Sequence, residues 1–230
     1  MADRLRRVEE RIAQAAQRVG RDPNSVQLVA VSKTKSVAEI REVAAAGARA
    51  FGENYVQELL EKRGEIGDAV EWHFIGHLQT NKARYLAPFC ALVHSVDSLK
   101  LAAEIDRRAQ QHHRRQPVLI EVKLSPEETK FGVDSETLAA LARALGERPG
   151  LDLCGLMVMP PYSEEPEASR PYYVRLRELR DQLREAGIPA ENGRHLSMGM
   201  TADFEVAIEG GATIVRVGTA IFGPRQPVGA

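Results

Sequence analysis

Two short segments of the sequence combine residues that could bind and react with an anionic ligand. In the segment VRVGTAIFGPR, Arg216 lies within an apolar strand, and Gly218-Thr219 follow that strand at once. A guanidinium in a protein core is costly unless a partner neutralises it. The backbone N–H groups of a turn made of small residues can bind phosphate. We therefore expect one phosphorylated ligand to contact both Arg216 and the Gly218-Thr219 turn.

The second segment is Ser32-Lys33-Thr34-Lys35, which follows an apolar run. A partly desolvated lysine is a better nucleophile toward aldehydes, because desolvation lowers the pKa of its amine. Lys35 has the same strand parity as Lys33, so the pattern alone does not choose between them, and a solvated lysine at a strand end also fits. An amine, a phosphate-binding turn and an arginine together indicate a phosphorylated aldehyde. Pyridoxal phosphate and sugar phosphates both match that description.

Eight apolar runs alternate with predicted helices along the chain. The runs cover residues 26–31, 48–51, 72–75, 92–96, 117–122, 151–159, 194–197 and 213–217. Such alternation without a linker is typical of a (β/α)8 TIM barrel, an α/β fold, whereas a doubly wound open sheet is the main alternative. We expect a single domain over residues 1–230, with an extra N-terminal helix that Asp3 caps and Gly20 ends.

The polar residues of such a barrel gather at the C-terminal ends of its strands. The loops after the seventh and eighth strands commonly bind phosphate. Ser197 supplies a hydroxyl there, and Gly199 and Gly218 permit close approach of the backbone. A helix that we predict to begin at Thr201 would point its N-terminus at the same place. Ordinary turn chemistry would explain the same glycines, so the pattern leaves the phosphate site as a hypothesis.

The composition is that of a soluble globular protein without a strong charge bias. Lys and Arg number 31 and Asp and Glu number 32, a formal net charge of -1, which argues against nucleic-acid binding through bulk charge. The charged first residues do not resemble a signal peptide and no apolar run is long enough to cross a membrane, so we expect a cytoplasmic protein. Cys90 and Cys154 are too few for a disulfide scaffold.

Six motifs follow one another in the order found in a known family. They are AVSKTK (30–35), FGENYVQE (51–58), WHFIGHLQTNK (72–82), GLMVMPP (155–161), LSMGMTADFEVAI (196–208) and VRVGTAIFG (215–223). Together they resemble the pyridoxal phosphate homeostasis protein family, also called the proline synthase co-transcribed or YggS-type family, over residues 28–222. The resemblance implies a barrel similar to the N-terminal domain of alanine racemase, with pyridoxal 5'-phosphate as the cofactor.

The resemblance also implies roles for individual residues. Lys33, the first lysine of SKTK, would hold the cofactor as a Schiff base, and Arg216 would face the pyridine nitrogen. Asn54 would lie near the cofactor. Ser197 and the backbone of the Gly218-Thr219 turn would hold the phosphate, which makes the full cofactor-binding set Lys33, Asn54, Ser197, Met198, Arg216, Gly218 and Thr219. We assign no catalytic residue and no metal ligand.

The resemblance implies that the chain is a cofactor carrier or regulator without robust catalysis. The sequence offers a physical reason for this. Arginine hardly gives up its proton, so a pyridine nitrogen that accepts from Arg216 stays unprotonated and the ring is a poor electron sink. The chain ends at Ala230, so we expect no second domain like the one that supplies a tyrosine base in alanine racemase. The alternative is a single-domain amino-acid racemase, for which Tyr162 is the candidate second base.

For partners, we expect apo forms of pyridoxal phosphate-dependent enzymes that receive the cofactor, no nucleic acid, no membrane, and a monomeric state. A regulatory module that binds another protein is a third hypothesis. The predicted helix over 171–186 is rich in charged residues. Such a pattern usually marks a solvated helix face, so it gives no positive support for a protein partner.

Overall fold

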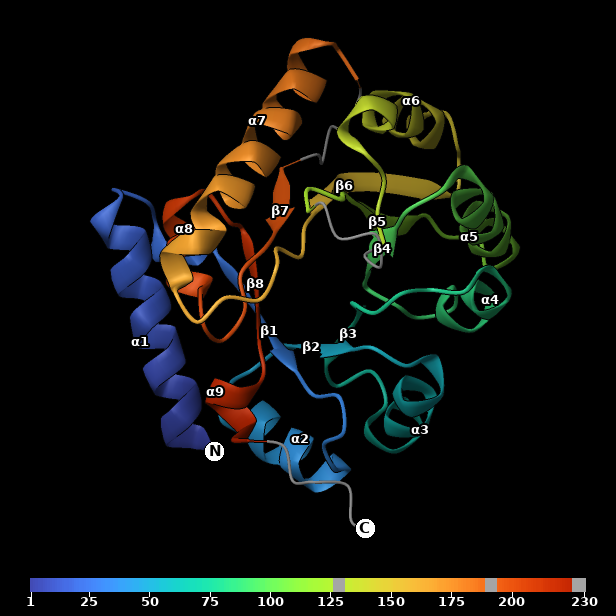
Figure 1. Ribbon diagram of the computed structural model, residues 1–230. Helices are drawn as coiled ribbons and strands as arrows, with labels where there is room; N and C mark the ends of the chain where they lie inside the picture. The colour runs from blue at the N-terminus through green and yellow to red at the C-terminus, as the bar shows by residue number, and fades with distance from the viewer. Residues whose placement is uncertain (126–130, 189–193, 225–230) are drawn as a thin grey trace.

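The computed structural model shows a closed barrel of parallel strands inside a ring of helices (Figure 1). The structure describes residues 1–125, 131–188 and 194–224. Within them the strands pair in chain order and β8 pairs with β1, which confirms the predicted (β/α)8 barrel. The strands are β1 (Gln27–Val31), β2 (Ala50–Glu53), β3 (Glu71–Phe74), β4 (Leu92–Val96), β5 (Gln116–Glu121), β6 (Leu151–Met157), β7 (His195–Ser197) and β8 (Ile214–Val217).

Helices cover the outside of the barrel. They are α1 (Ala2–Arg18), α2 (Val37–Ala45), α3 (Val56–Ile66), α4 (Ala83–Leu86), α5 (Leu99–Gln111), α6 (Ser135–Gly146), α7 (Arg170–Glu185), α8 (Phe204–Glu209) and α9 (Thr219–Phe222), with 3-10 turns at Pro23–Ser25, Thr80–Lys82 and Pro166–Ser169. A capping box begins α2, because the Ser36 hydroxyl accepts from the Glu39 N–H and the Glu39 carboxylate accepts from the Ser36 N–H.

The extra N-terminal helix is present and packs against α8 and α9 (Figure 1). Its cap differs from the prediction: α1 begins at Ala2 after Met1, so Asp3 lies in the first turn, where its charge suits the helix dipole. Leu5, Val8 and Ile12 are buried at the spacing of one helix face.

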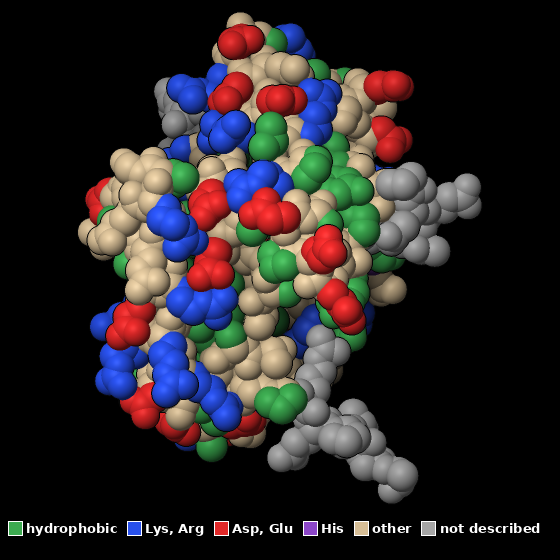
Figure 2. Space-filling view, turned by 60° about the vertical axis from the view of Figure 1, so that its left-hand side comes forward, with side chains coloured by type: hydrophobic (Ala, Val, Ile, Leu, Met, Phe, Trp, Pro, Cys, Tyr) green, Lys and Arg blue, Asp and Glu red, His purple; other side chains and the backbone are tan. Residues whose placement is uncertain are grey.

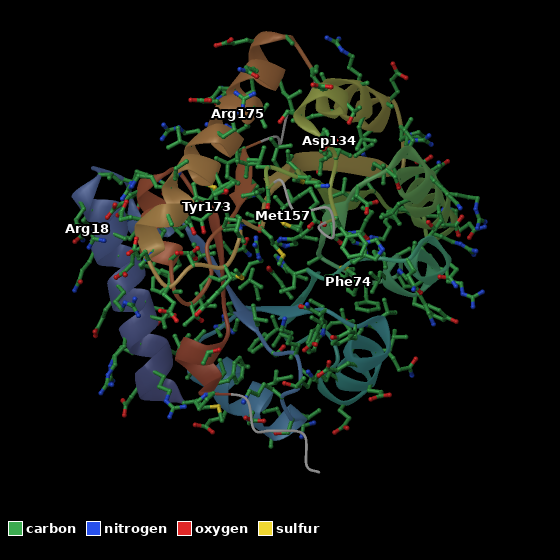
Figure 3. All side chains as sticks on the ribbon, viewed as in Figure 1. Arg18, Phe74, Asp134, Met157, Tyr173 and Arg175 are labelled. Atoms are coloured by element: carbon green, nitrogen blue, oxygen red, sulfur yellow. The ribbon has the colours of Figure 1, made fainter. Side chains whose placement is uncertain are left out.

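Apolar side chains pack against both the inner and the outer face of the barrel's strands. The inner cluster comes from the strands alone and comprises Val29, Ala50, Leu92, Leu119, Cys154, Met157 and Ile214. Figure 3 places Met157 within the ring of strands, whereas Arg18 and Arg175 lie on the outer helices. The register of β5 and β6 shifts between Val118 and Leu119. Toward the C-terminal ends of the strands, the side chains that point into the barrel are polar. These polar side chains form the base of the candidate site.

The outer surface over α1 and α7 carries interspersed charges of both signs (Figure 2). Ion pairs tie the helices together there: Arg11 on α1 binds Glu205 on α8 at 3.0 Å, and Arg170 on α7 binds Glu209 at 2.8 Å. This face therefore shows no basic patch of the kind that attracts nucleic acid. In the described part of the chain, no helix is long and apolar enough to span a membrane.

Candidate functional site

A cavity of about 320 Å³ lies at the C-terminal ends of the strands. Five of the predicted site residues line it together: Lys33, Asn54, Arg216, Gly218 and Thr219. Ser197 and Met198 do not line it, since both are fully buried beneath it. The barrel therefore brings the amine, the guanidinium and the small-residue turn to one place, as their positions after β1 and β8 require.

Lys33 lies in a loop after β1 whose backbone has an uncommon conformation. Thr34 has a φ of 63°, in the left-handed region that β-branched residues rarely adopt. The Thr34 N–H donates to Glu58 on α3 at 2.5 Å, and the Ser32 N–H donates to the Gly52 carbonyl at 3.0 Å. Strained backbone persists only where surrounding contacts hold it. These bonds therefore fix the direction in which Lys33 leaves the strand.

A buried lysine on α3 holds the same loop from behind. Lys62 Nζ donates to the Ser32 carbonyl at 2.6 Å, to Glu53 Oε1 at 2.7 Å and to Glu58 Oε1 at 2.7 Å. Glu53 is completely buried and also accepts from the Ser32 hydroxyl at 2.6 Å. Burial raises the pKa of Glu53, although Lys62 and Ser32 act in the opposite direction. These hydrogen bonds of Lys62, here called the Lys62 network, therefore hold in place the segment that carries Lys33.

Arg216 is buried in the barrel mouth, with 3% of its surface exposed. Its Nη1 donates to Ser197 Oγ at 2.6 Å and its Nη2 donates to the Val158 carbonyl at 3.1 Å. Among the described residues no carboxylate lies within ion-pair distance of the guanidinium. Burial lowers the pKa of Arg216, and nearby acidic groups, including Glu121, oppose that shift. A buried cation that lines a cavity without an ion pair attracts an anionic or electron-rich ligand.

A chain of hydrogen bonds continues from Arg216 through the barrel. Ser197 Oγ lies 2.8 Å from His94 Nδ1, and His94 Nε2 lies 3.0 Å from His73 Nδ1. His94 is neutral, because burial holds its pKa well below the ordinary value. Arginine can only donate, so the arrangement that pairs every hydrogen has Ser197 donating to His94 and His94 donating to His73. Ser197 therefore orients Arg216 from below the cavity.

The loop after β7 is held by Asp203. Its Oδ1 accepts from the Met200 N–H at 2.7 Å, and its Oδ2 accepts from Ser169 at 2.8 Å and from the Tyr173 hydroxyl at 2.6 Å. Tyr173 comes from α7, where Figure 3 labels it. This bracing forms a turn over Thr201 to Asp203, so α8 begins at Phe204 and the predicted start at Thr201 is wrong.

The sequence reasoning did not assign to the site two residues of these loops that the structure places in the cavity wall. Thr201 and Met200 both line the cavity. The Thr201 hydroxyl lies 3.5 Å from the Ala220 N–H, which places it beside the Gly218-Thr219 turn. The motif SMGMT holds two hydroxyls, and strand position separates them: Ser197 still belongs to β7, whereas Thr201 belongs to the loop above it.

A second cavity of about 280 Å³ adjoins the first and shares Asn54, Ile75 and Met159 with it. Glu121 at the end of β5 lines this second cavity. Burial raises the pKa of Glu121 to about 7, while Arg216 lowers it and Asp97 raises it further. This carboxyl therefore titrates near neutral pH, which sequence reasoning did not anticipate.

The raised pKa of Glu121 predicts a pH dependence of stability. The unfolded chain releases this proton near the ordinary pKa of 4.5, and the folded chain near 7, so the group lowers stability as pH rises through that window. Between pH 5 and pH 8, we expect the free energy of unfolding to fall by about 2.5 kcal/mol more in the native chain than in Glu121→Gln. Urea unfolding at both pH values tests this, and parallel pH profiles for the two proteins would contradict it.

The comparisons agree with this geometry. The family described as "Alanine racemase, N-terminal domain" matches residues 4–226. A pyridoxal phosphate homeostasis protein of Aquifex aeolicus is 50% identical over 226 residues, covering 97% of this chain and 98% of that protein. One of Pseudomonas aeruginosa is 45% identical over 227 residues, covering 98% and 96%.

Solved structures give the same result. PipY of Synechococcus elongatus, with PLP bound, is 38% identical with a TM-score of 0.83, covering 94% of this chain and 100% of that one. An alanine racemase of Clostridium difficile is 17% identical with a TM-score of 0.75, covering 98% of this chain and 57% of that one, so it shares the fold. The chain belongs to the pyridoxal phosphate homeostasis protein family.

Proposed function

We propose that this chain binds pyridoxal 5'-phosphate (PLP) in the mouth of its barrel and holds it, without robust catalysis, as part of vitamin B6 homeostasis. One observation supports this most directly: a single cavity is lined by Lys33, by the Gly218-Thr219 turn and by Arg216, whose guanidinium makes no ion pair with any described residue. Relatives named for PLP homeostasis at up to 50% identity and the PLP-bound PipY point the same way. The whole barrel would act as one PLP-binding domain.

The residues that line the cavity fit this ligand. PLP supplies an aldehyde that condenses with a primary amine, and Lys33 Nζ is the amine that we propose. The buried Asn54 Oδ1 finds no hydrogen-bond partner among the described residues, so it can accept from a hydroxyl of the ligand. The Gly218-Thr219 backbone and the Thr201 hydroxyl would bind the phosphate. In this proposal Ser197 and Met198 support the site from below, and Ser197 acts by orienting Arg216.

Arg216 accounts for the weak catalysis that we propose. Its bonds to Ser197 and Val158 hold the guanidinium in place, and it has only donors to offer. A pyridine nitrogen facing it must accept a hydrogen bond and remain unprotonated. The cofactor is a strong electron sink only when that nitrogen is protonated, so Arg216 favours storage over turnover.

The racemase alternative depends on Tyr162, and the structure does not favour it. Tyr162 lines the cavity, but 84% of its surface is exposed. Its hydroxyl makes no hydrogen bond to any described residue. A general base must be held close to the proton that it removes, and an exposed side chain without partners is not held. We therefore propose no catalytic role for Tyr162.

The protein would act as a monomer that passes PLP to apo forms of PLP-dependent enzymes. We place this role in the cytoplasm because Cys90 and Cys154 are both free and buried, which suits a reducing compartment. Neither thiol is disposed to react, since burial raises both pKa values to about 12.

Cofactor transfer is the experiment that tests this function. Protein loaded with PLP and freed of excess would be mixed with an apo enzyme and a phosphatase that destroys free PLP. We expect the apo enzyme to gain activity faster than from the same amount of free PLP. Equal rates from both sources would overturn the carrier role. Racemisation of alanine above the rate with free PLP would overturn the absence of robust catalysis.

A further inference from the structure

The second cavity at the barrel mouth is lined by a nearly buried carboxyl to which no described residue donates a hydrogen bond. Glu121 is 8% exposed and lines this cavity of about 280 Å³. In the described part of the chain no hydrogen bond or ion pair reaches its carboxyl group. Arg216, the cation that lowers the pKa of this carboxyl, donates its hydrogen bonds to Ser197 and to the Val158 carbonyl instead. An unpaired buried carboxylate calls for a donor.

A second acceptor belongs to a residue in the wall of the same cavity. Asn54 lines the cavity, and its buried Oδ1 finds no hydrogen-bond partner among the described residues. The approach is tight here, since a Cβ at Gly76 would come within 2.3 Å of the Asn54 carbonyl. The loop after β3 can therefore lie against Asn54 only with glycine at position 76. A carboxylate and an amide oxygen on residues that line one cavity favour a ligand with several donors on one atom, and a primary ammonium has three.

The remaining walls suit the carbon chain of a small ligand. Ile75, Leu124 and Met159 line the cavity with apolar surface. Phe131 stacks on His77 with ring centroids 3.6 Å apart and an interplanar angle of 14°. His77 Nδ1 in turn lies 3.5 Å from Asp97 Oδ2, which holds this wall in place.

We propose that this cavity is a site for a small primary ammonium compound, with the ammonium on the Glu121 carboxylate and Asn54 Oδ1 and the carbon chain against Ile75 and Leu124. Lys123 lines the same cavity. Its ammonium would suit a ligand carboxylate, so a zwitterionic amino acid and a simple amine are the two sources of this chemistry. The proposal rests on the proposed function only for the identity of the neighbouring cavity, because ammonium binding here needs no cofactor.

A competing explanation is that Glu121 only balances the charge of Arg216 across the barrel mouth. The two explanations differ in one respect. Charge balance requires no ligand, whereas an ammonium site requires measurable binding that depends on the carboxylate. A neutral, nearly isosteric replacement of Glu121 separates them.

Calorimetry on the PLP-free chain tests the site with three matched probes: isobutylamine, L-valine and isobutyrate. We expect the two ammonium compounds to bind and isobutyrate, which has no ammonium, to give no heat. Glu121→Gln should weaken ammonium binding at least tenfold, and Glu10→Gln, at an exposed position on α1, should leave it unchanged. A loss of L-valine binding alone in Lys123→Gln would identify an amino acid as the ligand.

Equal binding to the native chain and Glu121→Gln, or no binding of either ammonium compound, would overturn the proposal. Leu124→Trp, which fills the cavity without touching the carboxyl, provides a second test if Glu121→Gln fails to fold, and unchanged binding there would also overturn it. PLP binding measured by absorbance on the same samples reports separately on the proposed function. If the absorbance of bound PLP were absent while ammonium binding was intact, the result would contradict the proposed PLP binding and leave the ammonium site supported.

Discussion

Replacing Lys62 by methionine should lower the free energy of unfolding by about 3–5 kcal/mol, because removing one partner of a buried ion pair leaves the other charge uncompensated. The Lys62 side chain is 6% exposed and the Glu53 side chain 0%, so water cannot replace the lost bond. The Ser32 carbonyl would lose its bond to Lys62 Nζ as well. Urea unfolding at neutral pH measures the effect.

The double variant Lys62→Met with Glu53→Gln is the matched control. It removes both charges, so it should recover much of the stability that Lys62→Met loses. PLP binding should weaken in Lys62→Met and return in part in the double variant, since the network holds the loop that carries Lys33. If Lys62→Met lowered the free energy of unfolding by less than about 1 kcal/mol, the Lys62–Glu53 pair would contribute no more than an exposed salt bridge. That result would contradict the stabilising role of the Lys62 network.

The second large effect is expected at Arg216. Arg216→Gln should raise the dissociation constant for PLP by roughly 10- to 100-fold, because a hydrogen bond to a charged group contributes about 1.5–3 kcal/mol and each 1.4 kcal/mol is a factor of ten. A titration followed by the near-visible absorbance of the bound cofactor measures it.

Arg115→Gln is the control for the change in net charge. Arg115 lies just before β5, at the end of the barrel opposite the cavity, and donates to the Leu151 carbonyl. Its replacement should leave PLP affinity unchanged. Equal affinity for PLP in Arg216→Gln and the native chain would show that the guanidinium does not contact the ligand.

The barrel could be predicted from the sequence because parallel strands covered on both faces leave continuous apolar runs. The start of α8 could not, because it depends on a tertiary contact: Asp203 binds the Met200 N–H and forms a turn where propensity predicts helix.

The site was predictable where strand position decides it and unpredictable where long side chains do. Lys33 and Arg216 follow from their places relative to β1 and β8. Lys62 reaches the site from α3, and a lysine on a predicted helix surface gives no sign of burial. The contact of Ser197 with Arg216 depends on the register of two neighbouring strands, which no local pattern reveals.

The attachment of PLP to Lys33 is the central claim, and borohydride fixation tests it most directly. The native chain would be incubated with PLP, reduced, digested and analysed by mass spectrometry, alongside Lys33→Ala and Lys35→Ala. We expect the reduced adduct on the peptide bearing Lys33 in the native chain and in Lys35→Ala, and no adduct in Lys33→Ala. An adduct on Lys35 with Lys33 unmodified, or no adduct at all, would contradict it.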